Sequence, residues 1–288
     1  MTLALIGFGE AGQAFAQGFK LPAGRVKSYD LKFDQLNDNA DLLSAANALN
    51  VDPCRWAELC VREAELVFAL VPTDQTIAAA QAAAPHLAAN VLWLDGSSSS
   101  PGRKRDAAAI INGAGGRYVD MAIMAPVHPR LHKTPVLLSG PDASDAQAIA
   151  VTELGMVAEL AGEAIGEASA VKMIRSVLVK GIEAVTAECM LAARRAGVED
   201  RVIASFVRSD ANVDWAARTA YNLERMTHHG MRRAAEMREV VTTLDELGIP
   251  SRVSAATVAW QDQLGSLGDD SSERALLDQL DAILDRIQ

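Results

Sequence analysis

The sequence predicts an α/β protein, with a doubly wound and mainly parallel sheet followed by an all-α domain. In the first half of its 288 residues, short apolar runs alternate with helical stretches, which indicates βαβ units. After about Gly166 the pattern is helical and few strand-like runs remain. We therefore expect one domain over residues 1–163 and a second, helical domain over residues 164–288.

The expected elements of the first domain follow from composition and punctuation. The strands are short runs that are apolar, β-branched or bounded by glycine. In chain order they are Leu3–Ile6, Val26–Tyr29, Leu66–Val71, Val91–Leu94, Tyr118–Ile123 and Val136–Ser139. The helices expected between them include Glu10–Phe19, Thr73–Leu87 and Arg103–Ile111.

Composition excludes several classes of protein. Half of the residues are hydrophobic, so the chain can bury a sizeable core. The net charge of −10 argues against a nucleic-acid surface, which needs a basic face. No apolar run reaches the roughly 18 residues of a membrane span, and the N-terminus lacks a signal peptide's basic lead. The three cysteines have no metal-ligand spacing, so we expect no metal site, no disulfide framework and a cytoplasmic location.

A glycine-rich turn follows the first expected strand and opens the first expected helix. It comprises Gly7, Phe8, Gly9, Glu10, Ala11 and Gly12, and fits the G-x-G-x-x-G pattern. Gly7 permits the tight turn, Gly9 lets backbone approach a pyrophosphate, and Gly12 lets the helix pack on the strand. The helix N-terminus favours the anion. This context predicts a Rossmann-type dinucleotide site.

Asp30 ends the second expected strand and completes that site. Its carboxylate would accept hydrogen bonds from the adenosine ribose and repel a 2′-phosphate. The sequence thus favours NAD as cofactor. Lys27 and Lys32 lie close by, and they leave NADP possible.

Two later segments carry a family resemblance. The segment from Asp95 to Pro101 contains four consecutive serines and resembles the D-x-S-T-x-x-P substrate motif of the β-hydroxyacid dehydrogenases. Gly166–Ser176 is similar to their catalytic-helix motif, a small-residue turn followed by K-x-x-N-N. The family includes 3-hydroxyisobutyrate dehydrogenase and the 6-phosphogluconate dehydrogenases. The resemblance covers nearly the whole chain in order and spacing, and it is weaker near the C-terminus.

The resemblance implies an NAD(P)-dependent oxidoreductase and a homodimer. It implies hydride transfer between the nicotinamide and a small β-hydroxyacid or its semialdehyde or keto partner. It also implies cofactor contacts beyond the glycine turn at Val71, Pro72 and Thr73. From their chemistry and place in the chain, Ser98 is a further candidate cofactor contact, and the candidate substrate contacts are Ser97, His128, Arg175 and Ser176. Lys172 is the candidate general base, because burial favours the neutral amine that takes a hydroxyl proton.

The sequence also departs from the family pattern. Ser176 stands where the family usually has asparagine, and Met124–Pro129 replaces the S-G-G substrate loop. His128 in that loop is the candidate for a substrate contact peculiar to this chain. The lysine expected near the C-terminus is missing, so the chain resembles a divergent bacterial branch with an uncharacterised helical C-terminal domain.

Several alternatives remain open. The serine run also suits a helix N-cap through Ser99 or Ser100, Arg175 suits a salt bridge, and Lys180 suits a structural ion pair. An oxidative decarboxylase or an imine reductase would keep the fold, although imine reductases usually lack a lysine at the position of Lys172. A non-catalytic NAD-binding sensor is a third possibility.

Overall fold

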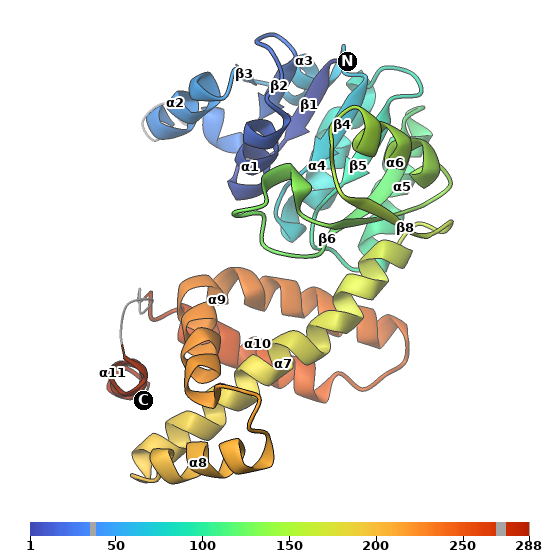
Figure 1. The fold of residues 1–288 in the computed structure, drawn as a ribbon. Coiled ribbons are helices and arrows are strands. Elements are labelled where there is room, and N and C mark those ends of the chain that lie inside the picture. Colours follow the sequence, from blue (N-terminus) through green and yellow to red (C-terminus); the bar gives the residue numbers. More distant parts are fainter. Residues whose placement is uncertain (35–38, 269–274, 288) are drawn as a thin grey trace. The chain divides into compact units, whose positions relative to one another are not determined.

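The computed structural model describes residues 1–34, 39–268 and 275–287 (Figure 1). The chain forms two compact units, Met1–Lys172 and Met173–Gln288, which we call unit 1 and unit 2. The division falls inside a long helix, so the boundary expected at residue 163 stays a prediction. No helix in the described ranges is both long and apolar enough to cross a membrane.

Unit 1 is built on one eight-stranded sheet with the order β3-β2-β1-β4-β5-β6-β7-β8. The strands are β1 (Leu3–Ile6), β2 (Val26–Tyr29), β3 (Val51–Cys54), β4 (Leu66–Ala69), β5 (Leu92–Asp95), β6 (Arg117–Ile123), β7 (Val136–Ser139) and β8 (Ala158–Gly162). β1 to β6 are parallel, and β7 runs antiparallel to β6. The predicted doubly wound, mainly parallel sheet is confirmed.

Two strands, β3 and β8, were not predicted from the sequence, and both form edges of the sheet. β3 contains Asp52 and Pro53, and β8 consists of alanine, glutamate, leucine and glycine. These residue types are mostly depleted in strands, and proline is tolerated only where one side of the strand lacks a partner. An edge strand needs less apolar sequence than a central one, so neither run carried a strand signal.

Helices cover both faces of the sheet. They are α1 (Glu10–Phe19), α2 (Ala40–Ala48), α3 (Ala57–Val61), α4 (Thr76–Ala83), α5 (Pro101–Gly113) and α6 (Ala143–Thr152), with 3-10 turns η1 (Leu31–Asp34), η2 (Thr73–Gln75), η3 (Ala84–His86) and η4 (Leu131–Lys133). The stretch expected over Thr73–Leu87 is helical from Thr73 to His86, but it is divided into η2, α4 and η3. Pro85 cannot donate a backbone hydrogen bond, which accounts for the end of α4 before η3.

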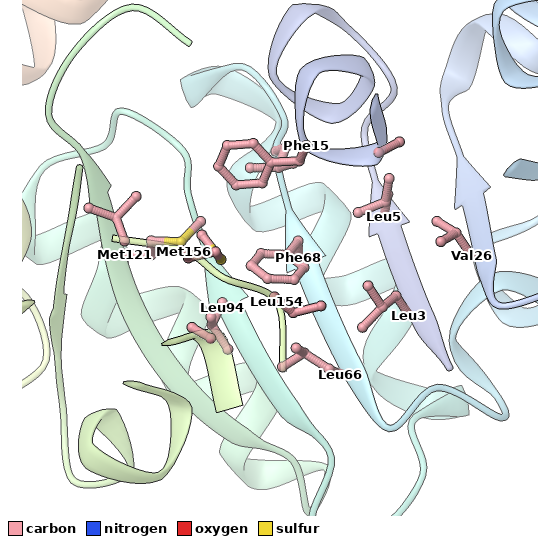
Figure 2. Close-up of a cluster of buried hydrophobic side chains, with 14 of the residues drawn as sticks. Leu3, Leu5, Phe15, Val26, Leu66, Phe68, Leu94, Met121, Leu154 and Met156 are labelled. Atoms are coloured by element: carbon pink, nitrogen blue, oxygen red, sulfur yellow. The ribbon is translucent and has the colours of Figure 1, made fainter. Parts of the chain in front are cut away.

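Alternate residues of the strands enter two separate cores. Leu3 and Leu5 of β1 pack in one cluster with Phe15 of α1 and Phe68 of β4 (Figure 2). Their neighbours in β1 pack on the opposite face, in a second cluster with α3, α4 and α5. Because both faces are covered, the carboxyl edge of the parallel strands is the part of the sheet left for a ligand.

Unit 2 is helical, as predicted. α7 (Glu167–Arg195) starts in unit 1 and continues into unit 2, where it is followed by α8 (Glu199–Ser209), α9 (Trp215–Glu246), α10 (Arg252–Gly265) and α11 (Leu276–Leu284). Gly230 of α9 and Gly265 of α10 bring two helices together. A Cβ on either glycine would lie under 3 Å from the other glycine's backbone, so the two helices cross with their backbones in contact.

Candidate active site

The glycine turn lies between β1 and α1 and has the geometry of a dinucleotide site. Gly7 has φ +100°, and a Cβ there would stand 2.6 Å from the carbonyl oxygen of Leu70. A Cβ on Gly12 would stand 2.5 Å from the carbonyl oxygen of Gly7. Only glycine fits at these two positions.

Gly9 differs, because space is open around it. No heavy atom lies within 4 Å of the place where its Cβ would stand, and both Gly9 and Glu10 are exposed. Gly9 is the N-cap residue of α1, so the first amides of the helix lie beside this open space with no intrahelical acceptors. The turn therefore fits a dinucleotide pyrophosphate. Ala11, in the same first turn, is half-buried.

Phe8 and Asp30 connect the glycine turn to the core and to the end of β2. The Phe8 ring is buried in the core, and its backbone N–H donates to Asp30 Oδ2 at 2.8 Å. Asp30 Oδ1 accepts from the N–H of Lys32 at 3.0 Å. Each carboxylate oxygen keeps a further lone pair, which is what ribose hydroxyls need. The structure thus places Asp30 at the turn, and Phe8 contributes to its support.

Lys27 is engaged on the neighbouring strand. Its ammonium lies 2.9 Å from the carboxylate of Glu63. The hydrogen bond that Lys27 donates to this carboxylate raises the pKa of Lys27 above its ordinary value. This pairing reduces the case for Lys27 as a 2′-phosphate ligand, and Lys32 remains exposed.

The loops after β4 and β5 are joined by hydroxyl groups. Thr73, two residues after Val71, donates from Oγ1 to the carbonyl oxygen of Ser98 at 2.7 Å. The hydroxyls of Thr76 and Ser99 lie 2.9 Å apart. Val71 and Pro72 lie between β4 and these contacts. The predicted cofactor segment and the serine run therefore lie next to each other at the carboxyl ends of β4 and β5.

The four serines divide into separate roles. Ser100 caps α5 by accepting from the N–H of Arg103, which confirms the capping alternative for this residue. Ser97 and Ser99 are buried, with their hydroxyls 3.0 Å apart. Ser98 is half-buried. Its hydroxyl is therefore better placed for a ligand than that of Ser97, the serine proposed from the sequence as a substrate contact.

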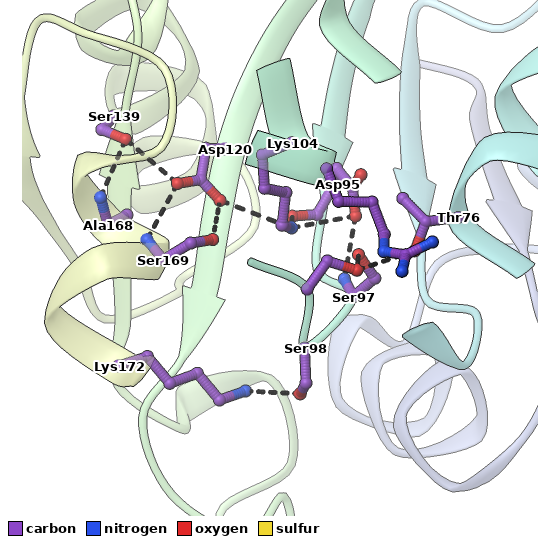
Figure 3. Close-up of polar contacts among 12 residues, drawn as sticks. Thr76, Asp95, Ser97, Ser98, Lys104, Asp120, Ser139, Ala168, Ser169 and Lys172 are labelled. Atoms are coloured by element: carbon purple, nitrogen blue, oxygen red, sulfur yellow. Dashed lines mark hydrogen bonds and ion pairs between the residues drawn. The ribbon is translucent and has the colours of Figure 1, made fainter. Parts of the chain in front are cut away.

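Lys172 meets the serine run. Its Nζ donates to Ser98 Oγ at 2.8 Å, although the two residues are 74 positions apart (Figure 3). Lys172 lies in the second turn of α7, and Ser98 follows β5. An amine and a hydroxyl that can exchange protons with a substrate thus come together at the carboxyl edge of the sheet.

Buried charges lie behind this pair, and the sequence prediction missed them. Lys104 is fully buried, with its Nζ 3.0 Å from Asp95 Oδ1 and 3.4 Å from Asp120 Oδ1 (Figure 3). Tyr118 donates its hydroxyl to Asp95 Oδ2 at 2.7 Å. A signal was available, since Asp120 interrupts an apolar run that was expected to be a buried strand.

The buried network shifts the pKa values of two of its members. Burial opposes ionisation of Asp95, but the ammonium of Lys104 and hydrogen bonds from Ser97 and Tyr118 hold its pKa below the ordinary value. Burial, followed by the negative charges of Asp95 and Asp120, raises the pKa of Tyr118 well above its ordinary range. Asp95 is thus an acceptor and Tyr118 a donor across the neutral pH range.

The remaining predicted substrate residues lie elsewhere in their units. His128 is exposed in the loop between β6 and η4, and Arg175 is exposed on α7. Ser176 is buried in unit 2, where Lys180 Nζ lies 3.3 Å from its hydroxyl. Lys180 also pairs with Glu236 at 2.9 Å, which supports the structural alternative for this lysine.

Two family models match separate parts of the chain. Residues 2–152, over half of the chain, match the family model described as the NAD binding domain of 6-phosphogluconate dehydrogenase. Residues 193–264 match a domain of unknown function, DUF1932. No curated protein matches the chain.

Solved structures give the same architecture over the full length. A conserved hypothetical protein from Sinorhizobium meliloti 1021 is 33% identical, with a TM-score of 0.77, over 100% of this chain and 97% of its own. A 3-hydroxyisobutyrate dehydrogenase from Mycobacterium tuberculosis, solved with L-serine, is 17% identical, with a TM-score of 0.71 and coverage of 98% and 97%. An imine reductase from Myxococcus stipitatus in complex with NADP+ is 18% identical, with a TM-score of 0.55 and coverage of 97% and 99%. The chain therefore belongs to the family that carries the NAD-binding domain of 6-phosphogluconate dehydrogenase, here joined to a DUF1932 domain.

Proposed function

We propose that the protein is an NAD(P)-dependent oxidoreductase of small β-hydroxyacids or of their semialdehyde or keto partners, with Lys172 as general acid and base. The observation that carries the proposal is the 2.8 Å contact between Lys172 Nζ and Ser98 Oγ, at the carboxyl edge that also carries the glycine turn. Open α/β sheets bind their ligands at this edge.

The chemistry assigned to the chain is proton transfer and positioning. When bound, the nicotinamide supplies the hydride acceptor for oxidation and the donor for reduction. Neutral Lys172 takes the proton of the substrate hydroxyl, and its ammonium returns that proton in the reverse direction. Ser98 directs the amine and offers a hydroxyl to the substrate, so these two residues act on the reacting oxygen.

For a carboxylate on the substrate we propose Arg175 as the main contact. Arg175 has the planar guanidinium that binds a carboxylate through two hydrogen bonds, and Ser97, His128 and Ser176 remain proposed contacts. The ligand of the mycobacterial dehydrogenase, L-serine, carries a hydroxyl on the carbon β to its carboxylate. That chemistry supports a β-hydroxyacid as the substrate class.

For the cofactor we propose NAD in preference to NADP. The carboxylate of Asp30 lies at the glycine turn, where it would repel a 2′-phosphate, and Lys27 is paired with Glu63. The fold admits either cofactor, so the proposal rests on these residues.

We further propose a homodimer in a reducing cytoplasm. Unit 2 carries an apolar groove of about 750 Å³, lined by residues of α7 to α10 that include Leu178, Val185 and Trp215. Leu178 is 68% exposed and Val185 63% exposed within the single chain. Apolar side chains gathered in this way favour burial against a second copy. Light scattering should give twice the chain mass of 30.6 kDa, and Leu178→Glu should give the monomer.

The function is tested with a panel of β-hydroxyacids in the presence of NAD. Production of NADH from one member is the expected result. A second panel of ketones with amines, monitored through NADPH consumption, tests the imine reductase alternative. NAD binding without turnover on either panel would contradict the proposal and favour a sensor.

A further inference from the structure

The first turn of α7 is tied to the sheet by one buried carboxylate. Asp120 accepts from the N–H of Ser169 at 2.9 Å and from its hydroxyl at 2.6 Å. Its Oδ2 also accepts from Ser139, whose hydroxyl in turn accepts from the N–H of Ala168 at 2.9 Å (Figure 3). Two amides that a helix start leaves without intrahelical acceptors are thereby bound to β6 and β7.

This attachment determines where Lys172 lies. Lys172 follows Ser169 by three residues, which is about one helical turn, so both project from the same face of α7. A helix is stiff over one turn. Fixing the backbone at Ser169 therefore fixes the backbone from which the Lys172 side chain reaches Ser98.

The same network holds the other half of the pair. Lys104 Nζ contacts Asp120 and donates to the carbonyl oxygen of Asp95 at 2.6 Å. Asp95 Oδ1 accepts from the N–H of Ser97 at 2.9 Å, immediately before Ser98. One buried ammonium thus links the loop of Ser98 to the carboxylate that anchors the helix of Lys172.

The energetic cost of this arrangement indicates a role beyond packing. Asp95, Lys104 and Asp120 are at most 1% exposed and have a formal net charge of −1. Burying such charges is expensive, and apolar residues of similar volume often serve stability as well or better. We propose that Asp120 is a positioning residue, which anchors the first turn of α7 and so holds Lys172 against Ser98. This inference rests on the proposed role of Lys172.

The test is the reactivity of the Lys172 amine in the full chain, which requires no substrate. Lysines are acetylated with limiting acetic anhydride at several pH values, and mass spectrometry compares Lys172 with exposed Lys133 in the same molecule. Ser169→Ala removes one hydroxyl from Asp120 and leaves the helix amides in place. Ser28→Ala is the matched control, because it also removes one buried serine hydrogen bond, to Leu5 at 3.0 Å.

Ser169→Ala should raise the acetylation rate of Lys172 relative to Lys133 by about fivefold, the factor that one lost hydrogen bond typically represents. Asp120→Asn should raise it at least as much, and Ser28→Ala should leave it unchanged. An unchanged or lower rate in both network variants overturns the proposal, even if their melting temperatures fall. Should the panel show no turnover while the rate still rises, the positioning role stands and the proposed function fails. Where turnover exists, the network variants should lower kcat with little change in KM.

Discussion

Both units contain a network of buried charged side chains, but among the described residues only the network in unit 1 is connected to candidate active-site residues. In unit 1, Asp95, Lys104 and Asp120 lie behind Lys172 and Ser98, both of which are half-buried. In unit 2, Arg233 of α9 pairs with Glu183 of α7, and Gln261 of α10 donates to the same carboxylate at 3.1 Å.

A buried ion pair therefore does not by itself mark an active site. The unit 2 network connects three helices and stays within their interior. The unit 1 network is connected, through Ser97 and Ser169, to the loop and helix that present an amine and a hydroxyl. Changes in the two networks should therefore give different phenotypes.

The largest expected effect is on catalysis in unit 1. Lys172→Ala should lower kcat by on the order of 10²–10⁴, because a positioned proton-transfer group contributes about that factor. Its melting temperature and NAD affinity should stay close to the wild type, since the glycine turn and Asp30 are untouched. Lys172→Arg should fail equally, because a guanidinium keeps its proton near neutral pH.

Steady-state kinetics on the active hydroxyacid checks this prediction, with Lys133→Ala as an exposed-lysine control. If Lys172→Ala keeps more than about a tenth of the wild-type kcat, the loss is smaller than a proton-transfer group implies. Another residue would then be the base. His128 would then be the first residue to examine.

In unit 2 the expected loss is of stability. Glu183→Ala leaves the guanidinium of Arg233 buried without its carboxylate, which typically costs about 3–5 kcal/mol. Arg233→Met combined with Glu183→Met should cost much less, because no lone charge is left. Urea unfolding measures both. Equal losses of unfolding free energy in the single and double variants would mean that the unpaired charge of Arg233 is not the cause of the lost stability.

Cofactor choice should change more modestly. Asp30→Ala removes the acceptor for the ribose hydroxyls and the repulsion of a 2′-phosphate, so NAD should bind about tenfold weaker, as loss of a hydrogen bond to a charged group implies. NADP binding should be affected less or improved. Fluorescence titration of both cofactors gives the ratio, and Asp52→Ala on β3 is the control. An unaltered NAD:NADP ratio would remove Asp30 from the specificity argument.

The smallest expected effect is a pH dependence carried by unit 2. Burial, together with Arg225, Arg232, His228 and Arg233, lowers the pKa of His229 from 6.5 to about 4. A histidine with a lowered folded pKa adds stability above its unfolded pKa, and this is lost as the pH falls from 6.5 toward 4. Since the ring is partly exposed, the contribution should be below about 1 kcal/mol.

His229→Gln should flatten the dependence of the melting temperature on pH within that window. The wild type and the variant should differ little at pH 8. Parallel curves over the whole range would show that His229 does not contribute.

Local sequence signals predicted much of unit 1. The β1–α1 turn has no room for a side chain at Gly7 or Gly12, so the glycine spacing in the sequence predicts this turn directly. The central strands are buried on both faces and consequently appear as apolar runs. The edge strands β3 and β8 carry no such requirement and were missed.

The polar framework of the site was less predictable. Lys104 looks in the sequence like any helix lysine next to arginines, and only the packing of α5 on β5 and β6 shows that it is buried. The pairing of Asp120 with Ser169 joins residues 49 positions apart, which no local pattern encodes. Resemblance to a family motif located Lys172, and the tertiary fold supplied its contact with Ser98.

We propose that unit 1 moves a hydride between a β-hydroxyacid and a nicotinamide with the help of Lys172. The most direct measurement uses the active hydroxyacid carrying deuterium on its carbinol carbon, with NMR of the nicotinamide C4 position after incubation with NAD. The wild type should deliver deuterium to C4, and Lys172→Ala should deliver it at least about a hundredfold more slowly. Reduced cofactor without deuterium at C4 would contradict direct hydride transfer from the carbinol carbon. Equal transfer by Lys172→Ala would contradict the role of Lys172.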